Sequence, residues 1–301
     1  MFSEPILALV GPTGAGKTAI AVRIAQALDA EIVNCDSRQV YRHLDIGTAK
    51  PSAEARRVVP HHLFDIVDPD QDFDCARYRV LGRAAIADIR ARGRRVVLVG
   101  GTGLYLKVLR YGLVPAPPRD PTLRRRLQDL EDAEPGALHR RLAGRDPAAA
   151  ERLHPHDRVR LIRALEVGEL TGTALSARQA AHGFRAAELE CRVIGLATER
   201  AALYARLDAR CRDMIAAGLV DEVRALWQRG FGPQLPPLRS IGYREIGAHL
   251  RGECDLEQAI AAMQRATRRF AKRQLTWFRA DPTVQWIEDQ AGSVERLLAL
   301  H

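Results

Sequence analysis

Residues 6–18 read Ile6-Leu7-Ala8-Leu9-Val10-Gly11-Pro12-Thr13-Gly14-Ala15-Gly16-Lys17-Thr18, a short apolar run followed by the pattern G-x-x-x-x-G-K-[ST]. The N–H groups of such a glycine loop surround phosphate oxygens, the lysine adds a positive charge, and the threonine hydroxyl can ligate Mg²⁺. Apolar residues recur at helical spacing over 17–28, and another apolar run follows at 31–34. The order strand, loop, helix, strand predicts a βαβ unit in a parallel sheet and a bound di- or triphosphate, rather than a glycine turn that binds nothing.

Further apolar runs at 63–67, 96–99, 192–196 and 284–287 predict additional strands. Four prolines between 115 and 121 interrupt the pattern, and 122–179 reads as short helices rich in Arg, Glu and Leu. A long amphipathic stretch over 200–230, broken at Gly218, and a last helix over about 255–279 follow. We therefore expect an α/β fold with a parallel sheet flanked by helices, in which a catalytic core (1–118 and 190–301) carries an inserted all-helical domain (119–189).

The composition indicates a basic protein. Its 301 residues include 46 basic and 37 acidic side chains, a net charge of +9, and only four of the basic residues are lysines: Lys17, Lys50, Lys107 and Lys272. A coding bias towards Arg explains that skew, while the basic excess favours polyanionic partners. Five scattered cysteines without a C-x-x-C pair argue against a disulfide framework or a zinc ribbon. With no basic leader and no apolar run near 18 residues, we expect a cytoplasmic protein without a membrane segment.

Two further positions follow predicted strands. Asp36 comes directly after the run at 31–34, and Thr102 lies in a glycine loop after the run at 96–99. Because ligands bind at the carboxyl ends of parallel strands, both side chains should face the phosphate loop. Asp36 is then a candidate general base or metal ligand, or alternatively a helix N-cap. The glycine loop around Thr102 is a weak motif that a tight turn would also explain.

Together these segments resemble the tRNA dimethylallyltransferases (tRNA isopentenyltransferases) of bacterial size, nearly end to end. The resemblance rests on six ordered blocks: GPTGAGKT (11–18), CDSRQVYRHLDIGTAKP (35–51), GGTGLY (100–105), HPHDRVRLIRALEV (154–167), RSIGYRE (239–245) and KRQLTWFR (272–279). It implies a P-loop NTPase-like core that transfers a dimethylallyl group from dimethylallyl diphosphate to N6 of adenosine 37 in tRNA, just 3′ of the anticodon, with Mg²⁺. A monomer is expected.

The resemblance also implies roles for individual residues. Asp36 and Thr102 would contact the adenine amine, with Asp36 as the general base, and Lys17 and Thr18 would hold the leaving diphosphate, with Thr18 ligating Mg²⁺. The diphosphate site would comprise Gly11, Pro12, Thr13, Gly14, Ala15, Gly16, Lys17 and Thr18. The tRNA contacts would be Asp36, Ser37, Arg38, Gln39 and Thr102, then Val159, Arg160, Leu161, Ile162 and Arg163, then Arg239, Ser240, Ile241, Gly242, Tyr243 and Arg244, and finally Lys272, Arg273, Gln274, Leu275, Thr276, Trp277, Phe278 and Arg279. The matched positions Asp45, Gly47 and Lys50 receive no individual chemistry, only a loop-fixing role.

The last predicted helix supports a nucleic-acid partner independently of the resemblance. Basic residues recur there at i+3 or i+4 spacing, and no acidic residue occurs over 258–280. Such a stripe suits a phosphate backbone, although an ordinary solvated face would look the same. Trp277 and Phe278 could stack on a base or pack in the core. Rival functions are an adenylate isopentenyltransferase that uses free nucleotide, a P-loop small-molecule kinase, and an RNA-binding nucleotide switch.

Overall fold

The computed structural model describes residues 4–184 and 186–288. The chain divides into two compact units, unit 1 (Met1–Arg110 and Glu188–His301) and unit 2 (Tyr111–Ala187). The sequence placed the corresponding boundaries at 119 and 189. Of the helices within residues 4–184 and 186–288, none has both the length and the apolar character needed to cross a membrane.

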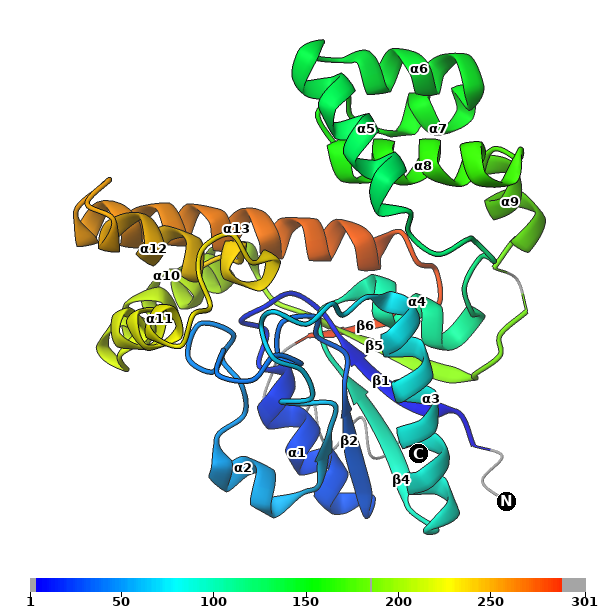
Figure 1. The fold of residues 1–301 in the computed structure, drawn as a ribbon. Helices are drawn as coiled ribbons and strands as arrows, with labels where there is room; N and C mark the ends of the chain where they lie inside the picture. The colour runs from blue at the N-terminus through cyan, green and yellow to red at the C-terminus, as the bar shows by residue number, and fades with distance from the viewer. Residues whose placement is uncertain (1–3, 185, 289–301) are drawn as a thin grey trace. The chain divides into compact units, whose positions relative to one another are not determined.

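Unit 1 is built on a six-stranded sheet in the order β3-β2-β4-β1-β5-β6, with every neighbouring pair parallel (Figure 1). Ala8 on the central strand lies opposite Leu98 on one side and Val193 on the other. The predicted parallel α/β fold is confirmed. The strands are β1 (Ile6–Val10), β2 (Ala30–Asn34), β3 (His61–His62), β4 (Arg95–Val99), β5 (Cys191–Ala197) and β6 (Val284–Glu288).

The predicted strand at 63–67 is wrong. The structure places only His61–His62 in β3, and Val67 forms a single isolated bridge with Tyr41. Leu63 and Asp65 have φ angles of 63° and 55°. A residue with positive φ cannot continue a pleated strand, so the chain leaves the sheet after His61 and His62, where the apolar run begins.

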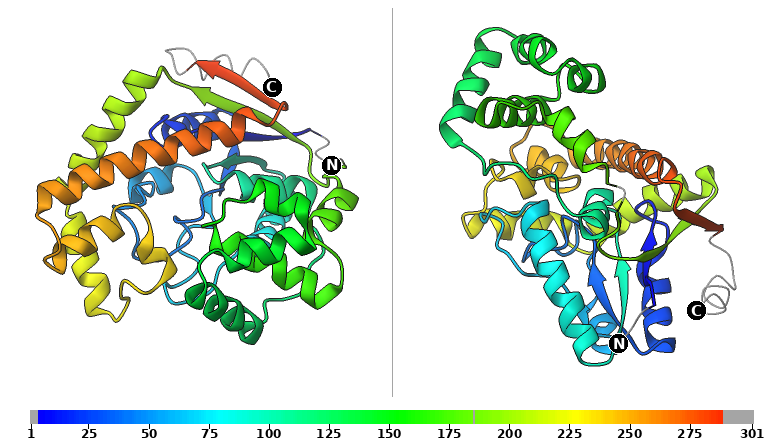
Figure 2. Two further views of the ribbon diagram at one scale, coloured as in Figure 1. Left: turned by 90° about the horizontal axis from the view of Figure 1, so that it is seen from above. Right: turned by 90° about the vertical axis from the view of Figure 1, so that its right-hand side faces the viewer.

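Helices flank the sheet of unit 1. They are α1 (Lys17–Ala27), α2 (Ala53–Val58), α3 (Cys75–Ala91), α4 (Gly103–Tyr111), α10 (Arg200–Ala216), α11 (Leu219–Gln228), the 3₁₀ turn η1 (Pro236–Arg239), α12 (Tyr243–Leu250) and α13 (Leu256–Arg279). Gly218, with φ of 99°, separates α10 from α11, so the predicted break is confirmed. The last helix begins after Asp255, whose side chain accepts a hydrogen bond from Gln258 N at 2.7 Å. It packs against α10 and α12 (Figure 2).

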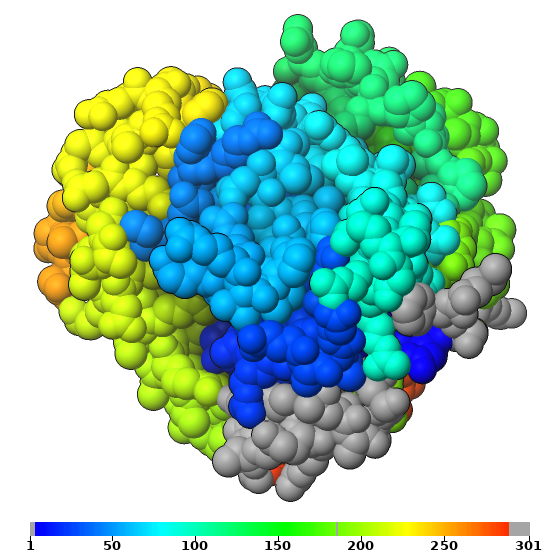
Figure 3. All heavy atoms as spheres, turned by 90° about the horizontal axis from the view of Figure 1, so that it is seen from below, coloured from blue at the N-terminus to red at the C-terminus, as the bar shows by residue number. Residues whose placement is uncertain are grey.

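Two large apolar clusters organise unit 1, beside a small one of Leu203, Leu207 and Ala271. The first includes Leu9, Ile24 and Val97 and packs α1 against the sheet. The second joins α11, α12 and α13 to the segment 40–46 and includes Leu44 and Ile246, both fully buried. This second cluster therefore fixes the chain that follows β2 against the C-terminal helices. Figure 3, a view from below, shows the face of unit 1 to which α1, α2 and α3 contribute.

The regular elements described in unit 2 are all helices. Its helices are α5 (Pro121–Ala133), α6 (Ala137–Arg145), α7 (Pro147–Arg152), α8 (Arg158–Thr171) and α9 (Leu175–His182). They enclose a separate apolar core. The carboxylate of Glu166 is fully buried in this unit, accepts a hydrogen bond from Asp120 N at 2.9 Å, and pairs with Arg124 and Arg163. Such pairing offsets the cost of burying its charge, so the unit has its own packing and its own polar network.

Candidate active site

The phosphate loop connects β1 to α1. Gly11, Gly14 and Gly16 have φ angles of 139°, 78° and 75°. A side chain at Gly14 would meet Leu207 of α10 at 2.6 Å. All three positions therefore favour glycine for backbone conformation, and Gly14 needs it for space as well. The loop delivers the chain into α1 with Lys17 as its first helical residue.

Lys17 curls back onto its own loop. Its ammonium donates hydrogen bonds to the carbonyl oxygens of Gly11 at 3.0 Å and Pro12 at 2.7 Å. Burial lowers the pKa of Lys17 from 10.5 to about 8, against the opposing effect of the Asp36 carboxylate and with a further lowering by Arg210. A phosphate that replaced the two carbonyl contacts would stabilise the charged form of this lysine.

Asp36 and Thr102 lie at the carboxyl ends of neighbouring strands, β2 and β4. Thr102 N donates to Cys35 O at 3.1 Å, and Ser37 N donates to Thr102 Oγ1 at 3.0 Å. Asp36 Oδ1 accepts a hydrogen bond from Arg38 N at 2.8 Å. No helix follows Asp36 directly, so the carboxylate shapes a turn and is not a helix N-cap. Within the described residues, its other oxygen makes no hydrogen bond.

One cavity in unit 1 brings the predicted reactive residues together. It has a volume of about 670 Å³ and is lined by Lys17, Thr18, Asp36 and Thr102. Of the rest of the phosphate loop, Thr13, Gly14 and Gly16 line the cavity, while Gly11, Pro12 and Ala15 are buried and do not line it. The geometry therefore places a carboxylate and a hydroxyl in the same space as a phosphate-binding loop.

Arg210 of α10 also lines this cavity and was not identified from the sequence. Its guanidinium donates to Thr13 Oγ1 at 3.4 Å. Burial lowers its pKa, while Cys211 and Asp36 raise it. Among so many arginines, neither composition nor a motif distinguishes this one, because its role depends on which face of α10 meets the phosphate loop. Arg210 adds a second cation beside Lys17.

Gln274 of α13 links the phosphate loop to the loop after β4. Its side-chain oxygen accepts from Thr13 N at 2.8 Å, and its amide nitrogen donates to Gly101 O at 2.9 Å. The side chain is buried, and a Cβ at Gly101 would collide with its amide nitrogen. Gln274 therefore fixes the distance between the two loops that carry Lys17 and Thr102.

Residues 47–50 form another wall, and the ion pairs of a buried lysine fix the segment 45–50. Lys50, with a side chain 2% exposed, pairs with Asp45 and Asp65 and donates to Tyr41 O. Gln39 donates its amide to Thr48 O at 3.0 Å and to Ala49 O at 3.1 Å. The predicted loop-fixing role of Asp45 and Lys50 agrees with these contacts.

Glu222 of α11 also fixes the segment 45–50, through hydrogen bonds to its backbone. Its carboxylate accepts hydrogen bonds from the backbone N–H groups of Asp45, Ile46 and Gly47 at 3.1, 2.7 and 3.2 Å, and from Tyr243 OH at 2.6 Å. A Cβ at Gly47 would meet the Tyr243 ring at 2.6 Å. Burial and the adjacent Glu222 carboxylate raise the pKa of the Tyr243 hydroxyl. Tyr243 is thus a structural contact of the cavity wall.

The segments predicted to contact tRNA contain both buried and exposed side chains. Six of the named residues are buried in their own units: Leu161, Ile162, Gly242, Tyr243, Gln274 and Phe278. Exposed members include Arg38, Val159, Arg160, Arg239, Arg244, Lys272, Arg273, Thr276, Trp277 and Arg279. Contact with tRNA stays a prediction, and within these segments the exposed side chains are the ones available for it.

The aromatic pair on α13 is divided between the two roles considered for it. Phe278 is 2% exposed and packs in the core, whereas Trp277 is 45% exposed. A Cβ at Gly103 would collide with the indole of Trp277, so the ring lies against the start of α4. Arg273 on the same helix lines the cavity and lies over the Phe270 ring, 5.7 Å from its centroid. Only Trp277 of the pair is therefore available to stack on a base.

Comparisons with known proteins relate the chain to isopentenyl transferases. A family model described as IPP transferase matches residues 39–281, and one described as isopentenyl transferase matches residues 5–60. The chain is 53% identical to a tRNA dimethylallyltransferase of Geobacter metallireducens, over 92% of this chain and 90% of that protein. It is also 53% identical to one of Anaeromyxobacter dehalogenans, over 94% of both chains.

Solved structures give the same result. The tRNA isopentenylpyrophosphate transferase of Bacillus halodurans is 39% identical, with a TM-score of 0.72 over 99% of this chain and 95% of that one. A eukaryotic dimethylallyltransferase acting on tRNA is 29% identical, with a TM-score of 0.81 over 99% of this chain and 78% of that one. With the family model covering most of its length, this chain belongs to the IPP transferase family.

Proposed function

We propose that this protein transfers a dimethylallyl group from dimethylallyl diphosphate to N6 of adenosine 37 in tRNA, giving N6-(dimethylallyl)adenosine. The observation that carries the proposal is the single cavity lined by both a phosphate-binding loop and the Asp36 and Thr102 side chains. Relatives of this protein are named tRNA dimethylallyltransferase, or dimethylallyltransferase acting on tRNA. We propose that it acts as a monomer in the cytoplasm.

The acceptor half of the reaction depends on Asp36 and Thr102. The exocyclic amine of adenine is a poor nucleophile because its lone pair is delocalised into the ring. As N6 forms its bond to the allylic carbon, the free carboxylate oxygen of Asp36 takes the amine proton, and the Thr102 hydroxyl orients the amine. The adenine must leave its stack in the anticodon loop to reach the cavity.

The donor half depends on stabilising the diphosphate as the allylic C–O bond breaks. Negative charge then develops on the leaving oxygen, within reach of Lys17, Arg210 and the loop N–H groups. Here the phosphate loop would assist loss of diphosphate from carbon and not transfer of a phosphoryl group. These side-chain cations would offset part of the charge on the diphosphate, and the transfer would need no covalent bond to the protein.

The donor set of the cavity fits Mg²⁺. Thr18 and Asp36 offer oxygen ligands there, and residues 4–184 and 186–288 contain no cluster of three or more His, Cys, Asp or Glu side chains able to hold a metal ion. This pattern suits a hard cation that keeps several waters and is held mainly by substrate phosphates. Bound with the diphosphate, Mg²⁺ would supply further stabilisation of the leaving group. We propose Thr18 as its protein ligand.

The experiment offers labelled dimethylallyl diphosphate with tRNA, with AMP, or with neither, followed by mass analysis of the nucleosides. We expect N6-(dimethylallyl)adenosine in tRNA digests only. Prenylation of AMP but not tRNA would favour an adenylate isopentenyltransferase, which the match of residues 5–60 to an isopentenyl transferase model makes the second candidate.

The Asp36→Ala variant tests the assigned mechanism. We expect its transfer rate to fall by roughly 10²- to 10⁴-fold, because the amine loses its proton acceptor, while tRNA affinity changes little. A loss of tRNA affinity as large as the loss of rate would count against Asp36 as the base. ATP turnover without a prenyl donor would indicate a kinase.

A further inference from the structure

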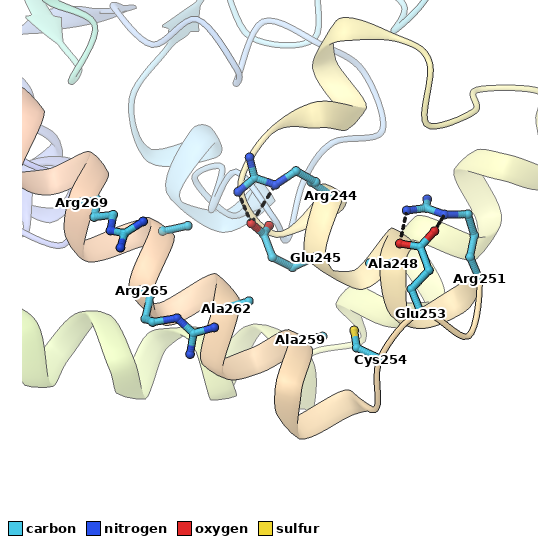
Figure 4. A pocket seen from close by; sticks show the side chains of 11 residues that line it. Arg244, Glu245, Ala248, Arg251, Glu253, Cys254, Ala259, Ala262, Arg265 and Arg269 are labelled. Carbon is cyan, nitrogen blue, oxygen red and sulfur yellow. Dashed lines mark hydrogen bonds and ion pairs between the residues drawn. The ribbon is translucent and has the colours of Figure 1, made fainter. Parts of the chain in front are cut away.

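A second hollow in unit 1 lies between α12 and α13 (Figure 4). It has a volume of about 460 Å³, and we call it the α12–α13 groove. Alanines, among them Ala262 and Ala266, line its wall, and four arginines stand around it: Arg244, Arg251, Arg265 and Arg269. The side chains along the wall of the groove are thus small, and those at its rim are cationic.

The charges of the groove do not cancel. Arg244 pairs with Glu245 and Arg251 pairs with Glu253. Arg265 and Arg269 are exposed and, among the described residues, have no ion-pair partner. They are one turn apart on α13, about 6 Å along the helix axis. The groove therefore offers two free guanidinium groups on one helix face, without the large apolar side chains that would anchor a protein partner.

The groove continues from the candidate active site. Arg244 lines both the groove and the 670 Å³ cavity. On α13, Arg273 lines the cavity, and Arg269 and Arg265 follow at one-turn intervals along the groove. If one base of a nucleic-acid strand lay in the cavity, the arginines of α13 would be the next cations available to the phosphates of that strand.

We infer that the α12–α13 groove binds the sugar–phosphate backbone of the substrate RNA next to the modified nucleotide, with Arg265 and Arg269 each contacting a phosphate. Guanidinium groups bind phosphate oxygens through paired hydrogen bonds, and the small alanines let the backbone approach the helix. The inference rests on the proposed function, because it takes the base in the cavity to belong to tRNA.

The test compares two double variants of the full chain with the same charge change. Arg265→Gln/Arg269→Gln removes the two groove cations, and Arg57→Gln/Arg229→Gln removes two exposed arginines that line neither hollow. The dissociation constant of unmodified tRNA is measured for each by filter binding over a range of salt concentrations. Transfer rates are measured at saturating tRNA.

For the groove variant we expect roughly tenfold weaker tRNA binding at low salt and a log–log salt slope reduced by about 1.4 to 1.8, corresponding to two lost phosphate contacts. Its rate at saturating tRNA should match that of the unsubstituted protein. The control variant should change little in either measurement. Equal slopes for the two variants would overturn the inference. Binding is measured without the prenyl donor, so failure of the unsubstituted protein to prenylate tRNA would instead refute the proposed function.

Discussion

The Gln274→Glu substitution tests whether the bridge between the two active-site loops matters for catalysis. Glutamate has almost the same size and shape as glutamine and keeps an oxygen that can accept from Thr13 N. It replaces the amide nitrogen that donates to Gly101 O with a second oxygen. One hydrogen bond is lost, and two oxygens then face each other in a buried space.

The expected magnitude follows from that geometry. Leaving the buried Gly101 carbonyl without its donor costs about 1 to 3 kcal/mol, and repulsion between the oxygens adds to it. The loops relieve this by separating, which moves Thr102 relative to Lys17. Because misplacement of about 1 Å can cost 10²-fold in rate, we expect kcat/KM for the prenyl donor to fall roughly 10- to 100-fold.

The assay separates a positioning role from contact with tRNA. Transfer kinetics give kcat and KM for dimethylallyl diphosphate, calorimetry gives the affinity for pyrophosphate with Mg²⁺, and filter binding gives the affinity for tRNA. Gln264→Glu is the matched control, since Gln264 lies on the same helix and donates to a backbone carbonyl, Asp208 O, at 3.0 Å. We expect Gln274→Glu alone to lower kcat and pyrophosphate affinity, with tRNA affinity within about twofold of normal.

The reverse pattern would refute this reasoning. If Gln274→Glu weakened tRNA binding and left kcat and pyrophosphate affinity intact, Gln274 would be a tRNA contact, as the sequence suggested. Equal losses in both glutamate variants would show that any added charge on α13 has the effect. A merely structural role would lower the melting temperature of the variant without changing the kinetics of the folded fraction.

Three further predictions follow from the cavity walls. Raising the pH from 7 to 9 should weaken pyrophosphate binding through a transition near pH 8, because Lys17, with its lowered pKa, loses its charge there. The Lys17→Met variant should lack this transition. The free energy of unfolding should rise over the same pH range, since Lys17 in the unfolded chain has a pKa of about 10.5 and still holds its proton. Glu222→Gln should destabilise the protein by roughly 2 to 3 kcal/mol in urea unfolding, because a carboxylate that accepts four hydrogen bonds becomes neutral. Tyr243→Phe removes only one of these hydrogen bonds and should cost about 1 kcal/mol. Equal costs for the two variants would contradict this reasoning. Gly100→Ala should destabilise the protein by more than about 3 kcal/mol, because the new Cβ would overlap the Cys35 carbonyl. Gly168→Ala within α8, where a Cβ would have nothing within 4 Å, should stabilise unit 2 by up to about 1 kcal/mol. Melting curves that rank the two variants otherwise would refute the steric argument.

The sheet was largely predictable because buried parallel strands have a local signature. The runs at 6–10, 31–34, 96–99, 192–196 and 284–287 each correspond to a strand. The exception at 63–67 shows the limit of that signature: its apolar residues are buried for a different reason. Val67 packs with Leu44 in the cluster of the C-terminal helices, and not in the sheet. Apolar character predicts burial, but not the neighbours against which a residue is buried.

The reactive groups of the cavity were predictable where they follow a strand, and not where they come from a helix. Strand ends place Asp36 and Thr102 beside the phosphate loop whatever the rest of the chain does. Arg210 and Glu222 reach the cavity walls only because α10 and α11 pack back onto the loops after β1 and β2. That packing depends on long-range contacts, so nothing near either residue in the sequence marks it.

The block KRQLTWFR shows how one helical segment can carry two roles. Residues 272, 273, 276 and 279 are exposed, whereas Gln274 and Phe278, four residues apart, are buried on the opposite side. The sequence assigned the whole block to tRNA because an unbroken match does not distinguish the faces of a helix. The structure places cations on the outer face and the amide that joins Thr13 to Gly101 on the inner one. Substitutions on the outer face should therefore change tRNA affinity, and those on the inner face the chemistry.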